Sequence, residues 1–297
     1  MRPVWLVGSA GMLGRQVALE LERNRIPFRA SDREVDVADS DRLRTFEEGE
    51  KFGWIVNCSA YTAVDRAETE RGEAFRVNAL GAENLAAVSR RIGATLVHFS
   101  TDYVFDGTQR RPYREDDPPR PLNVYGQSKL DGERRVAAVG GRYFIFRLSG
   151  LYGVFGHNFV ATMLSRFAGN GEPRVVDDQV GSPTYAGLLA KNLVSLIRGG
   201  GEEYGTYHCS DEGQVSWFDF AVGIGEAALG AGLIRSRARV RPVGTREYAA
   251  AAPRPAYSVL DKEKVKQTLR FEIRDWKANL EKFFGEYRNS GRQKEGS

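Results

Sequence analysis

A chain of 297 residues with 41% hydrophobic and 28% charged side chains has the composition of a folded globular protein, which excludes a mainly disordered state. Its net charge of +4 is spread along the sequence, so we expect no nucleic-acid partner. The chain has two cysteines and no apolar run of about 18 residues, which predicts a protein of the reducing cytoplasm without membrane spans.

The first half of the chain alternates short apolar runs with longer amphipathic segments, as parallel strands joined by crossover helices do. This order predicts an α/β fold with a doubly wound, Rossmann-type parallel sheet. We expect its strands at Val4–Val7, Phe28–Ser31, Trp54–Cys58, Thr95–Ser100 and Tyr143–Leu148. The crossover helices are expected at Gly11–Arg23, Asp39–Glu48, Arg71–Arg91 and Asn123–Val136.

Beyond about residue 150, glycine-rich turns interrupt this alternation and predict a smaller C-terminal substrate-binding lobe. The chain should return to the sheet near Tyr204–Cys209, and the helices of this half are expected at Asn158–Phe167, Thr184–Ile197, Trp217–Leu229 and Trp276–Tyr287. We assign residues 1–150 and about 180–232 to an NAD(P)-binding Rossmann domain, and about 151–179 and 233–288 to the lobe. The polar residues 289–297 are expected to be a disordered tail.

Three glycines follow the first expected strand and open the first helix. Gly8 permits a tight turn, Gly11 lets the backbone approach a pyrophosphate, and Gly14 lets the helix pack closely on the strand. The free N–H groups at the start of the helix then face the phosphates. The loop therefore predicts a dinucleotide site.

The residues after the second expected strand bear on which dinucleotide binds. Asp32 lies where such folds place an acidic residue on the adenosine ribose, which favours NADH. Arg33, helped by Arg15, has the charge to hold a 2′-phosphate instead, which favours NADPH. The choice between NADH and NADPH stays open at this point.

A phenol and an ammonium group occur four residues apart, at Tyr125 and Lys129, and on a helix they share a face. At about 4 Å and an effective dielectric of about 20, their attraction is about 4 kcal/mol, enough to lower the pKa of the phenol by up to ~3 units. We expect Tyr125 to act as a general acid on this basis. Thr101, at the end of the fourth expected strand, could hydrogen-bond the same carbonyl oxygen.

Several segments carry a wider likeness: the glycine loop, Tyr61–Glu68, Ser100–Gly107, Tyr125–Lys129, Gly156–Val160, Asp177–Thr184 and Arg254–Ser258. In combination they resemble the dTDP-4-dehydrorhamnose reductase family of extended short-chain dehydrogenases. The resemblance runs from residue 4 to about residue 285. It implies hydride transfer from NADPH or NADH to C4 of a dTDP-linked 4-keto-6-deoxy sugar, with proton donation by Tyr125.

The resemblance also implies residue roles. Thr101, Tyr125 and Lys129 would be catalytic. The cofactor would be bound by Gly8, Gly11, Met12, Leu13, Gly14, Asp32, Arg33, Asp36, Val37, Ala60, Tyr61, Ser100, Tyr125 and Lys129. The substrate would be bound by Thr62, Val64, Thr101, Asp102, Tyr103, Asn158, Gln179 and Arg254.

The chain departs from the family pattern at two positions. Some members place a tryptophan against the substrate where this chain has Gly150. Tyr152 is then the nearest expected aromatic residue, and the exact sugar stays open. Some members bind magnesium at a dimer contact through glutamates, and Gln16 stands at one of these positions. We therefore expect no metal, and a homodimer stays open.

Two alternatives share parts of this pattern. A sugar-nucleotide 4,6-dehydratase or 4-epimerase would have the same glycine loop and Tyr125/Lys129 pair, but dehydratases have a glutamate where this chain has Tyr103. A regulatory subunit of the same fold would not need Thr101, Tyr125 and Lys129 together. A reductase is the favoured interpretation.

Overall fold

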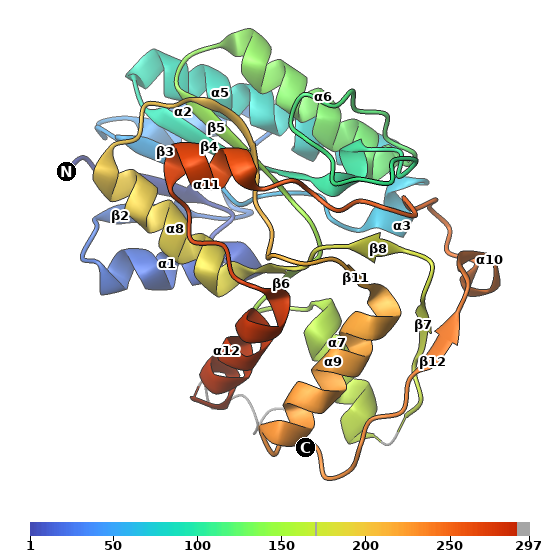
Figure 1. Cartoon of the computed structure of the whole chain (residues 1–297). Helices are drawn as coiled ribbons and strands as arrows, with labels where there is room; N and C mark the ends of the chain where they lie inside the picture. The colour runs from blue at the N-terminus through green and yellow to red at the C-terminus, as the bar shows by residue number, and fades with distance from the viewer. Residues whose placement is uncertain (170, 290–297) are drawn as a thin grey trace.

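The computed structural model describes residues 1–169 and 171–289. At its centre lies a parallel six-stranded sheet of order β10-β5-β4-β3-β1-β2 (Figure 1). The expected doubly wound α/β fold is confirmed, and each expected strand is present. The strands are β1 Val4–Val7, β2 Phe28–Ser31, β3 Trp54–Asn57, β4 Thr95–Thr101, β5 Tyr143–Leu148 and β10 Gly205–His208.

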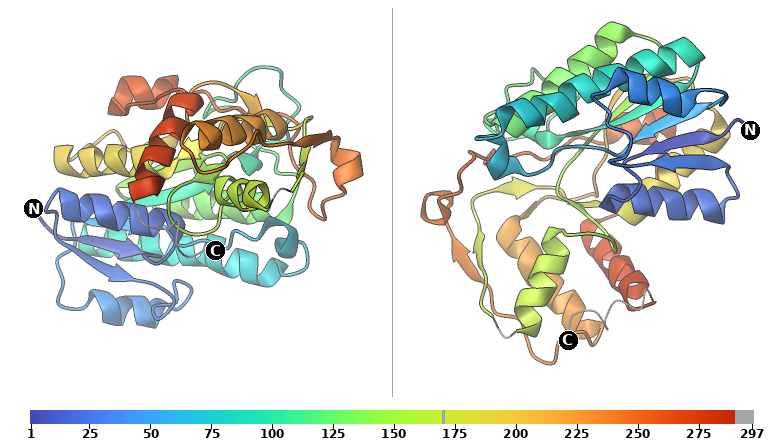
Figure 2. Two further views of the ribbon diagram at one scale, coloured as in Figure 1. Left: turned by 90° about the horizontal axis from the view of Figure 1, so that it is seen from below. Right: turned by 180° about the vertical axis from the view of Figure 1, so that it is seen from behind.

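Alternate residues of the buried strands supply two apolar layers. Val4 and Leu6 face one layer with helices α1 (Met12–Arg23) and α8 (Ala186–Gly199). Trp5 and Val7 face the other, which is covered by α2 (Ser40–Glu47), α5 (Gly81–Ile92) and α6 (Val124–Val139). Figure 2 shows the helices on both sides of the sheet. Since parallel strands end at one edge, this packing places the loops after β1, β2, β3 and β4 together.

The helix expected at Arg71–Arg91 is interrupted. Within this range a short helix, α4 (Arg71–Phe75), is followed by a π-helical turn, η1 (Arg76–Leu80), which leads into α5. Another short helix, α3 (Val64–Ala67), precedes α4. Turns of the π-helical kind add a residue to the helical repeat and are frequent at functional sites. Apolar periodicity predicted the helical state of this segment but not the π turn within it.

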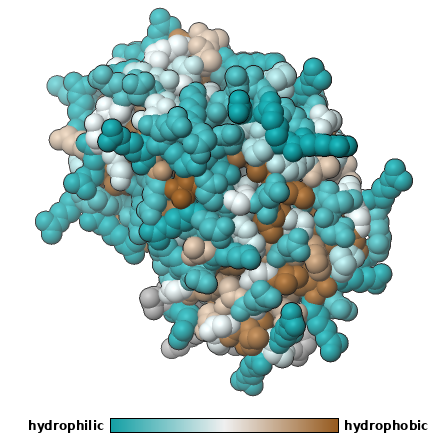
Figure 3. Space-filling model, viewed as in Figure 1, coloured by the Kyte–Doolittle hydropathy of each residue, from teal (hydrophilic) through white to brown (hydrophobic). Residues whose placement is uncertain are grey.

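The rest of the chain builds a smaller part with its own apolar cluster. Helices α7 (Phe159–Ala168), α9 (Trp217–Gly230) and α12 (Trp276–Asn289) pack together there (Figure 1). Residues 217–230 were expected to belong to the Rossmann domain, but Phe220 and Ile224 of α9 lie in this second cluster. Several hydrophobic residues reach the surface of this part, at the lower right of Figure 3.

The remaining described elements are short. They are η2 (Asp102–Val104), β6 (Leu151–Tyr152), β7 (Arg174–Val176), β8 (Val180–Gly181), β9 (Thr184–Tyr185), β11 (Val215–Ser216), β12 (Arg241–Val243), α10 (Thr245–Tyr248) and α11 (Glu263–Leu269). Of the expected tail, only Asn289, where α12 ends, lies within the described residues.

Candidate functional site

The glycine loop forms a cradle that a side chain would fill. Gly8 has a φ of +73°, and a Cβ there would lie 2.6 Å from the backbone nitrogen of Ser59. A Cβ on Gly14 would lie 2.1 Å from the carbonyl oxygen of Gly8. Gly11 is the N-cap of α1, and no side chain caps the first N–H groups of this helix. An uncapped helix start with a close-packed loop fits a pyrophosphate.

The loop opens into a groove of about 670 Å³ at the carboxyl edge of the sheet. Among the expected cofactor residues, the groove is lined by Gly8, Gly11, Asp32, Arg33, Asp36, Val37, Ala60 and Tyr61. Met12, Leu13 and Gly14 form the first turn of α1 beside it, with the Leu13 side chain packed into the core. Ser100 ends near this edge on β4, and its buried Oγ has no hydrogen-bond partner among the described residues, so it suits a polar ligand group.

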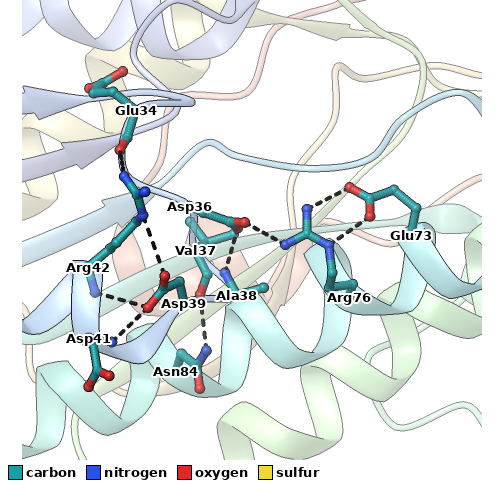
Figure 4. Close-up of polar contacts among 10 residues, drawn as sticks. All are labelled: Glu34, Asp36, Val37, Ala38, Asp39, Asp41, Arg42, Glu73, Arg76 and Asn84. Atoms are coloured by element: carbon teal, nitrogen blue, oxygen red, sulfur yellow. Dashed lines mark hydrogen bonds and ion pairs between the residues drawn. The ribbon is translucent and has the colours of Figure 1, made fainter.

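One wall of the groove is an ion-pair network that the sequence did not predict (Figure 4). Arg76, on the π turn, pairs with Asp36 at 2.6 Å and with Glu73 at 2.7 Å. Burial raises the pKa of Asp36, but hydrogen bonds from the Ala38 N–H and from Arg76 hold it below its usual value. The network therefore stays charged and fixes the wall from β2 to α4. Because the π turn brings Arg76 here, helical periodicity could not have identified it.

Asp32 connects the end of β2 to the glycine loop. Its carboxylate accepts hydrogen bonds from the backbone N–H groups of Ala10, at 2.8 Å, and Arg33, at 2.9 Å. The Arg33 side chain is exposed and makes no ion pair within the described residues. An acid and an unpaired cation thus lie side by side in the groove.

The three expected catalytic residues come from two neighbouring elements. Tyr125 and Lys129 lie on α6, where the N-cap residue Asn123 accepts a 2.7 Å hydrogen bond from Gly126 N–H. Thr101 ends β4, and its hydroxyl lies close enough to the Tyr125 phenol to lower the pKa of that phenol. Tyr61, which lines the groove, and Tyr125 pack against the same small apolar cluster. The structure therefore brings the phenol, the hydroxyl and the groove together.

The expected effect of Lys129 on Tyr125 is wrong for the free protein. Burial raises the pKa of Tyr125 to about 12, although the neighbouring Thr101 hydroxyl acts in the opposite direction, and the Asp102 charge adds to the increase. Lys129 is itself buried, and this burial lowers its pKa to about 8 against the opposing charge of Glu133. Desolvation is the largest cause of both shifts, and neither residue is among the groups that shift the pKa of the other. The phenol is consequently protonated at neutral pH, the form that can donate a proton.

A second cavity, of about 240 Å³, lies where the smaller part meets η2. It brings together three of the expected substrate residues, Tyr103, Gln179 and Arg254. The ring of Tyr103 lies 6.0 Å from that of Tyr125, edge to face, and so connects this cavity to the phenol. The lining also includes residues that were not predicted for the site: Phe159, Thr162, Met163, Arg174, Val175, Val176, Trp217 and Tyr248.

Trp217 is the aromatic residue next to Gly150. A Cβ on Gly150 would lie 3.2 Å from Cη2 of Trp217, and Gly150 has a φ of +51°. Tyr152, expected to be nearest, is instead buried in the apolar cluster of the smaller part. The expectation failed because Trp217 is 67 positions away in sequence and reaches Gly150 only through the packing of α9.

Other expected substrate residues are turned toward the protein. The Asp102 carboxylate accepts hydrogen bonds from Thr101 at 3.0 Å, Ser149 at 2.7 Å and Ser258 at 2.6 Å. Asn158 caps α7 and donates to the Gly153 carbonyl at 2.9 Å. These contacts give both side chains a structural role in the free protein. Thr62 is exposed and Val64 half-buried at the start of α3, outside both hollows.

No group of three or more histidine, cysteine, aspartate or glutamate side chains among the described residues is placed to hold a metal ion. None of the helices in residues 1–169 and 171–289 combines the length and apolar character needed to cross a bilayer.

A dinucleotide groove and a Tyr–Lys helix at the carboxyl edge of one parallel sheet define an oxidoreductase of the extended short-chain dehydrogenase class. Comparison with known proteins then narrows this class. The family model described as RmlD substrate binding domain matches residues 1–289, and the chain belongs to the dTDP-4-dehydrorhamnose reductase family.

Similar proteins cover nearly the whole chain. A dTDP-4-dehydrorhamnose reductase of Aggregatibacter actinomycetemcomitans is 37% identical, over 94% of this chain and 97% of its own. A probable dTDP-4,6-dihydroxy-2-methyloxan-3-one 4-ketoreductase of Streptomyces antibioticus is 39% identical, over 94% of each. The crystal structure of dTDP-4-dehydrorhamnose reductase from Bacillus anthracis in complex with NADP is 39% identical, with a TM-score of 0.89 over 96% of this chain and 99% of that one.

Proposed function

We propose that this chain reduces the 4-keto group of a dTDP-linked 6-deoxy sugar, converting dTDP-4-dehydrorhamnose to dTDP-rhamnose in cell-surface polysaccharide biosynthesis. The observation that carries the proposal is the Thr101–Tyr125 pair, which lies beside both the dinucleotide groove and the cavity of Tyr103. The relatives named for this reaction support the choice of substrate.

The residues present fit a nicotinamide dinucleotide. The start of α1 and the glycine loop would hold the pyrophosphate, and Asp32 or Arg33 would bind the adenosine ribose or its phosphate. Bound NADPH or NADH would supply the hydride. Ser100, Ala60 and Tyr61 would line the remainder of the cofactor site.

The protein's own chemistry is the movement of one proton. Tyr125 is protonated because burial raises the pKa of its phenol, so it can donate to the oxygen of the ketone as negative charge develops there. In the free protein the Thr101 hydroxyl donates its one proton to Asp102 at 3.0 Å. To donate to the oxygen of the ketone, the hydroxyl would turn from Asp102 toward the substrate. Lys129 is buried on the same helix and would bind the nicotinamide ribose.

The sugar nucleotide would occupy the cavity beside Tyr103, with Gln179 and Arg254 binding it. A relative named for a different 4-keto sugar has nearly the same identity, so overall similarity does not select the sugar. The proposal also includes the cytoplasm as the location, because Cys58 and Cys209 are free thiols, and a homodimer as the assembly. Light scattering of the purified protein tests the assembly.

Turnover of a panel of dTDP-4-keto sugars, followed through nicotinamide absorbance, tests the proposal. One substrate should consume NADPH or NADH in a 1:1 ratio to product, because a reductase transfers each hydride permanently. Turnover that needs no added reduced cofactor would instead indicate an epimerase or a dehydratase, and the absence of turnover with every ketone would favour a regulatory role.

Replacing the proton donor tests the assignment of Tyr125. Tyr125→Phe should lower kcat by about 10²–10⁴-fold, the usual contribution of a general acid, while the affinity for NADPH stays near that of the wild type. Tyr204→Phe is the matched control, since Tyr204 is an exposed tyrosine outside both hollows. Wild-type turnover by Tyr125→Phe would remove the role proposed for this phenol.

A further inference from the structure

A short segment of the smaller part, Ala252–Pro255, lies directly on the Rossmann part. A Cβ on Gly107 would lie 2.6 Å from the Cβ of Pro255, so the loop after η2 packs closely against the end of this segment. The segment leads to Ser258, whose hydroxyl bonds Asp102 beside Thr101. The backbone that carries Arg254 is thus in close contact with the catalytic region.

Asp65 of α3 holds this segment by its carboxylate. It accepts from Nη1 and Nη2 of Arg254, at 2.9 and 2.8 Å, and from the backbone N–H of Ala252, at 2.9 Å. The Arg254 guanidinium also donates to the carbonyl oxygen of Ala252, at 2.7 Å. Isolated surface ion pairs contribute little, but a bidentate pair with a backbone hydrogen bond fixes the orientation of both groups.

Asn123 holds the same segment from the catalytic helix. This side chain is 1% exposed, and its two polar atoms have different partners. Its Oδ1 caps α6 by accepting from Gly126 N–H, and its Nδ2 donates to the carbonyl oxygen of Pro253 at 2.8 Å. One buried amide therefore connects the backbone beside Arg254 to the first turn of the helix on which Tyr125 lies.

The guanidinium of Arg254 also faces the cavity. It lines the cavity with Gln179 and Tyr103, its charge lowers the pKa of the Tyr103 phenol, and the Tyr103 ring lies edge to face with that of Tyr125. Its side chain is 17% exposed, compared with 49% for Asp65, so the pair is covered on the arginine side. The order of contacts is Asp65, Arg254, Tyr103, Tyr125.

We propose that Asp65 and Asn123 are positioning residues that fix Arg254 beside Tyr103, so that the diphosphate of the sugar nucleotide binds Arg254 with its ketone at Tyr125. This inference rests on the proposed function for the identity of the ligand. An arginine oriented before binding does not have to be ordered by the ligand, so the effect falls on substrate affinity. The two residues contribute to KM, and the chemical step belongs to Thr101 and Tyr125.

Replacing Asp65 by asparagine keeps the shape of the side chain and removes the charge that holds Arg254. For Asp65→Asn, the Kd of dTDP-glucose, measured by calorimetry as a probe without a ketone, should rise roughly tenfold, the loss of one charge-assisted contact. KM for the keto substrate should rise similarly, and kcat and the Kd of NADPH should stay within about twofold. A wild-type Kd for dTDP-glucose overturns the inference.

Asn123→Asp separates the two functions of the Asn123 side chain, which caps α6 and donates to the Pro253 carbonyl. An aspartate still accepts from Gly126 N–H but cannot donate to the Pro253 carbonyl. We expect the Kd of dTDP-glucose to rise severalfold with the helix content unchanged, and an unchanged Kd overturns the role of Asn123. This variant also tests the contact with the segment if Asp65→Asn does not fold.

The chain offers a matched control in Asp117. Its carboxylate makes the same kind of contacts as that of Asp65: a bidentate pair with Arg111, at 2.9 and 2.8 Å, and a 2.7 Å hydrogen bond from the backbone N–H of Arg114. Asp117 lies outside both the groove and the cavity. Asp117→Asn should leave the Kd of dTDP-glucose unchanged. A rise equal to that of Asp65→Asn would indicate a general loss of structure and overturn the inference.

A double-mutant cycle completes the test. In an Arg254→Gln background, Asp65→Asn should change the Kd of dTDP-glucose little further, because Asp65 acts through Arg254. Additive effects would overturn the inference. The proposed function fails separately, if the wild type reduces no ketone while these binding changes appear as expected.

Discussion

At the scale of single residues, burial decides what the site can do. Residue spacing correctly placed Tyr125 and Lys129 on one helix, but it could not show that both side chains are removed from water. Desolvation depends on residues from distant parts of the chain, so it is absent from local sequence. The result is a neutral phenol and a lysine that can lose its charge near physiological pH.

The low pKa of Lys129 predicts a pH limit on activity. Its pKa is about 8 in the free protein, so the cation that would bind the cofactor is present below pH 8 and is lost above it. The pKa of Tyr125, about 12, is too high to cause this loss. We expect kcat/KM to fall about tenfold per pH unit above pH 8, because kcat/KM reports the ionisation of the free enzyme.

The control for this limit is Lys129→Arg, because a guanidinium keeps its charge at every pH tested. The fall in kcat/KM should move above pH 10 in this variant, whatever its maximal rate. A fall that stays near pH 8 would assign the limit to another group.

The surroundings of Gly150 lead to a second prediction at the residue scale, which concerns KM for the sugar nucleotide. An added Cβ would lie 3.2 Å from Trp217, which lines the cavity, so Gly150→Ala should displace the indole and raise KM for the sugar nucleotide several-fold. The positive φ also strains any alanine there, at a cost of about 1–2 kcal/mol. Steady-state kinetics and tryptophan fluorescence measure the two consequences.

Gly200→Ala isolates the backbone strain. Gly200 has a φ of +64°, in the left-handed region, but no atom within 4 Å of an added Cβ. Its alanine variant should lose similar thermal stability and keep its KM. Equal KM values in the two variants would show that Trp217 does not bear on the sugar.

At the scale of elements, the sequence predicted the sheet well because β1, β3 and β5 are short, mainly apolar runs. The ranges of β1, β2 and β5 agree with expectation at both ends. The π turn, the placement of α9 and the short paired strands of the smaller part were not predictable, since they depend on tertiary contacts with no local periodicity. The missed site residues Arg76 and Trp217 belong to these elements.

The approach of α6 to η2 is the element contact on which the site depends. A Cβ on Gly126 would lie 2.2 Å from the carbonyl oxygen of Tyr103, so only glycine permits this distance. Gly126→Ala should move the helix outward, lower kcat more than tenfold and cost about 1–3 kcal/mol of stability. Thermal unfolding and steady-state kinetics of the same preparation measure both.

Gly285 provides the contrast, because it is a helical glycine of α12 with no atom within 4 Å of an added Cβ. Gly285→Ala should raise stability by up to about 1 kcal/mol through helix propensity and leave kcat unchanged. If Gly126→Ala kept the kcat and the stability of the wild type, as is expected for kcat in Gly285→Ala, the site would not depend on the close approach of α6 to η2.

At the scale of the whole molecule, one buried carboxyl group just beyond the end of β10 is hydrogen-bonded to the smaller part. Asp211 accepts from the Tyr185 backbone N–H at 3.3 Å, from Asn279 of α12 at 2.8 Å and from the Tyr152 hydroxyl at 3.4 Å. The two parts of the molecule are thus joined through a polar contact as well as through the chain. Because the cavity of the site lies between these parts, the stability of this junction bears on function.

The junction predicts a pH-dependent stability. Burial raises the pKa of Asp211 from 3.8 to about 7, although its hydrogen bonds and Lys262 act in the opposite direction. Between these values the folded state binds more protons than the unfolded state, so the contribution of Asp211 to the free energy of unfolding falls from pH 4 to pH 7. Asp211→Asn removes this loss while keeping an acceptor for Asn279, so it should stabilise the protein by at most about 4 kcal/mol at pH 8 and much less at pH 5.

Urea unfolding of wild type and variant at the two pH values measures that difference. Asp41→Asn, at a side chain that is 86% exposed, should shift stability by no more than about 0.5 kcal/mol at either pH. A difference between Asp211→Asn and wild type that is the same at pH 5 and pH 8 would mean that Asp211 is ionised in the folded protein throughout. The junction would then be a contact between an ionised carboxylate and neutral donors, and acid would weaken it. The raised pKa predicts the opposite, that acid strengthens the junction.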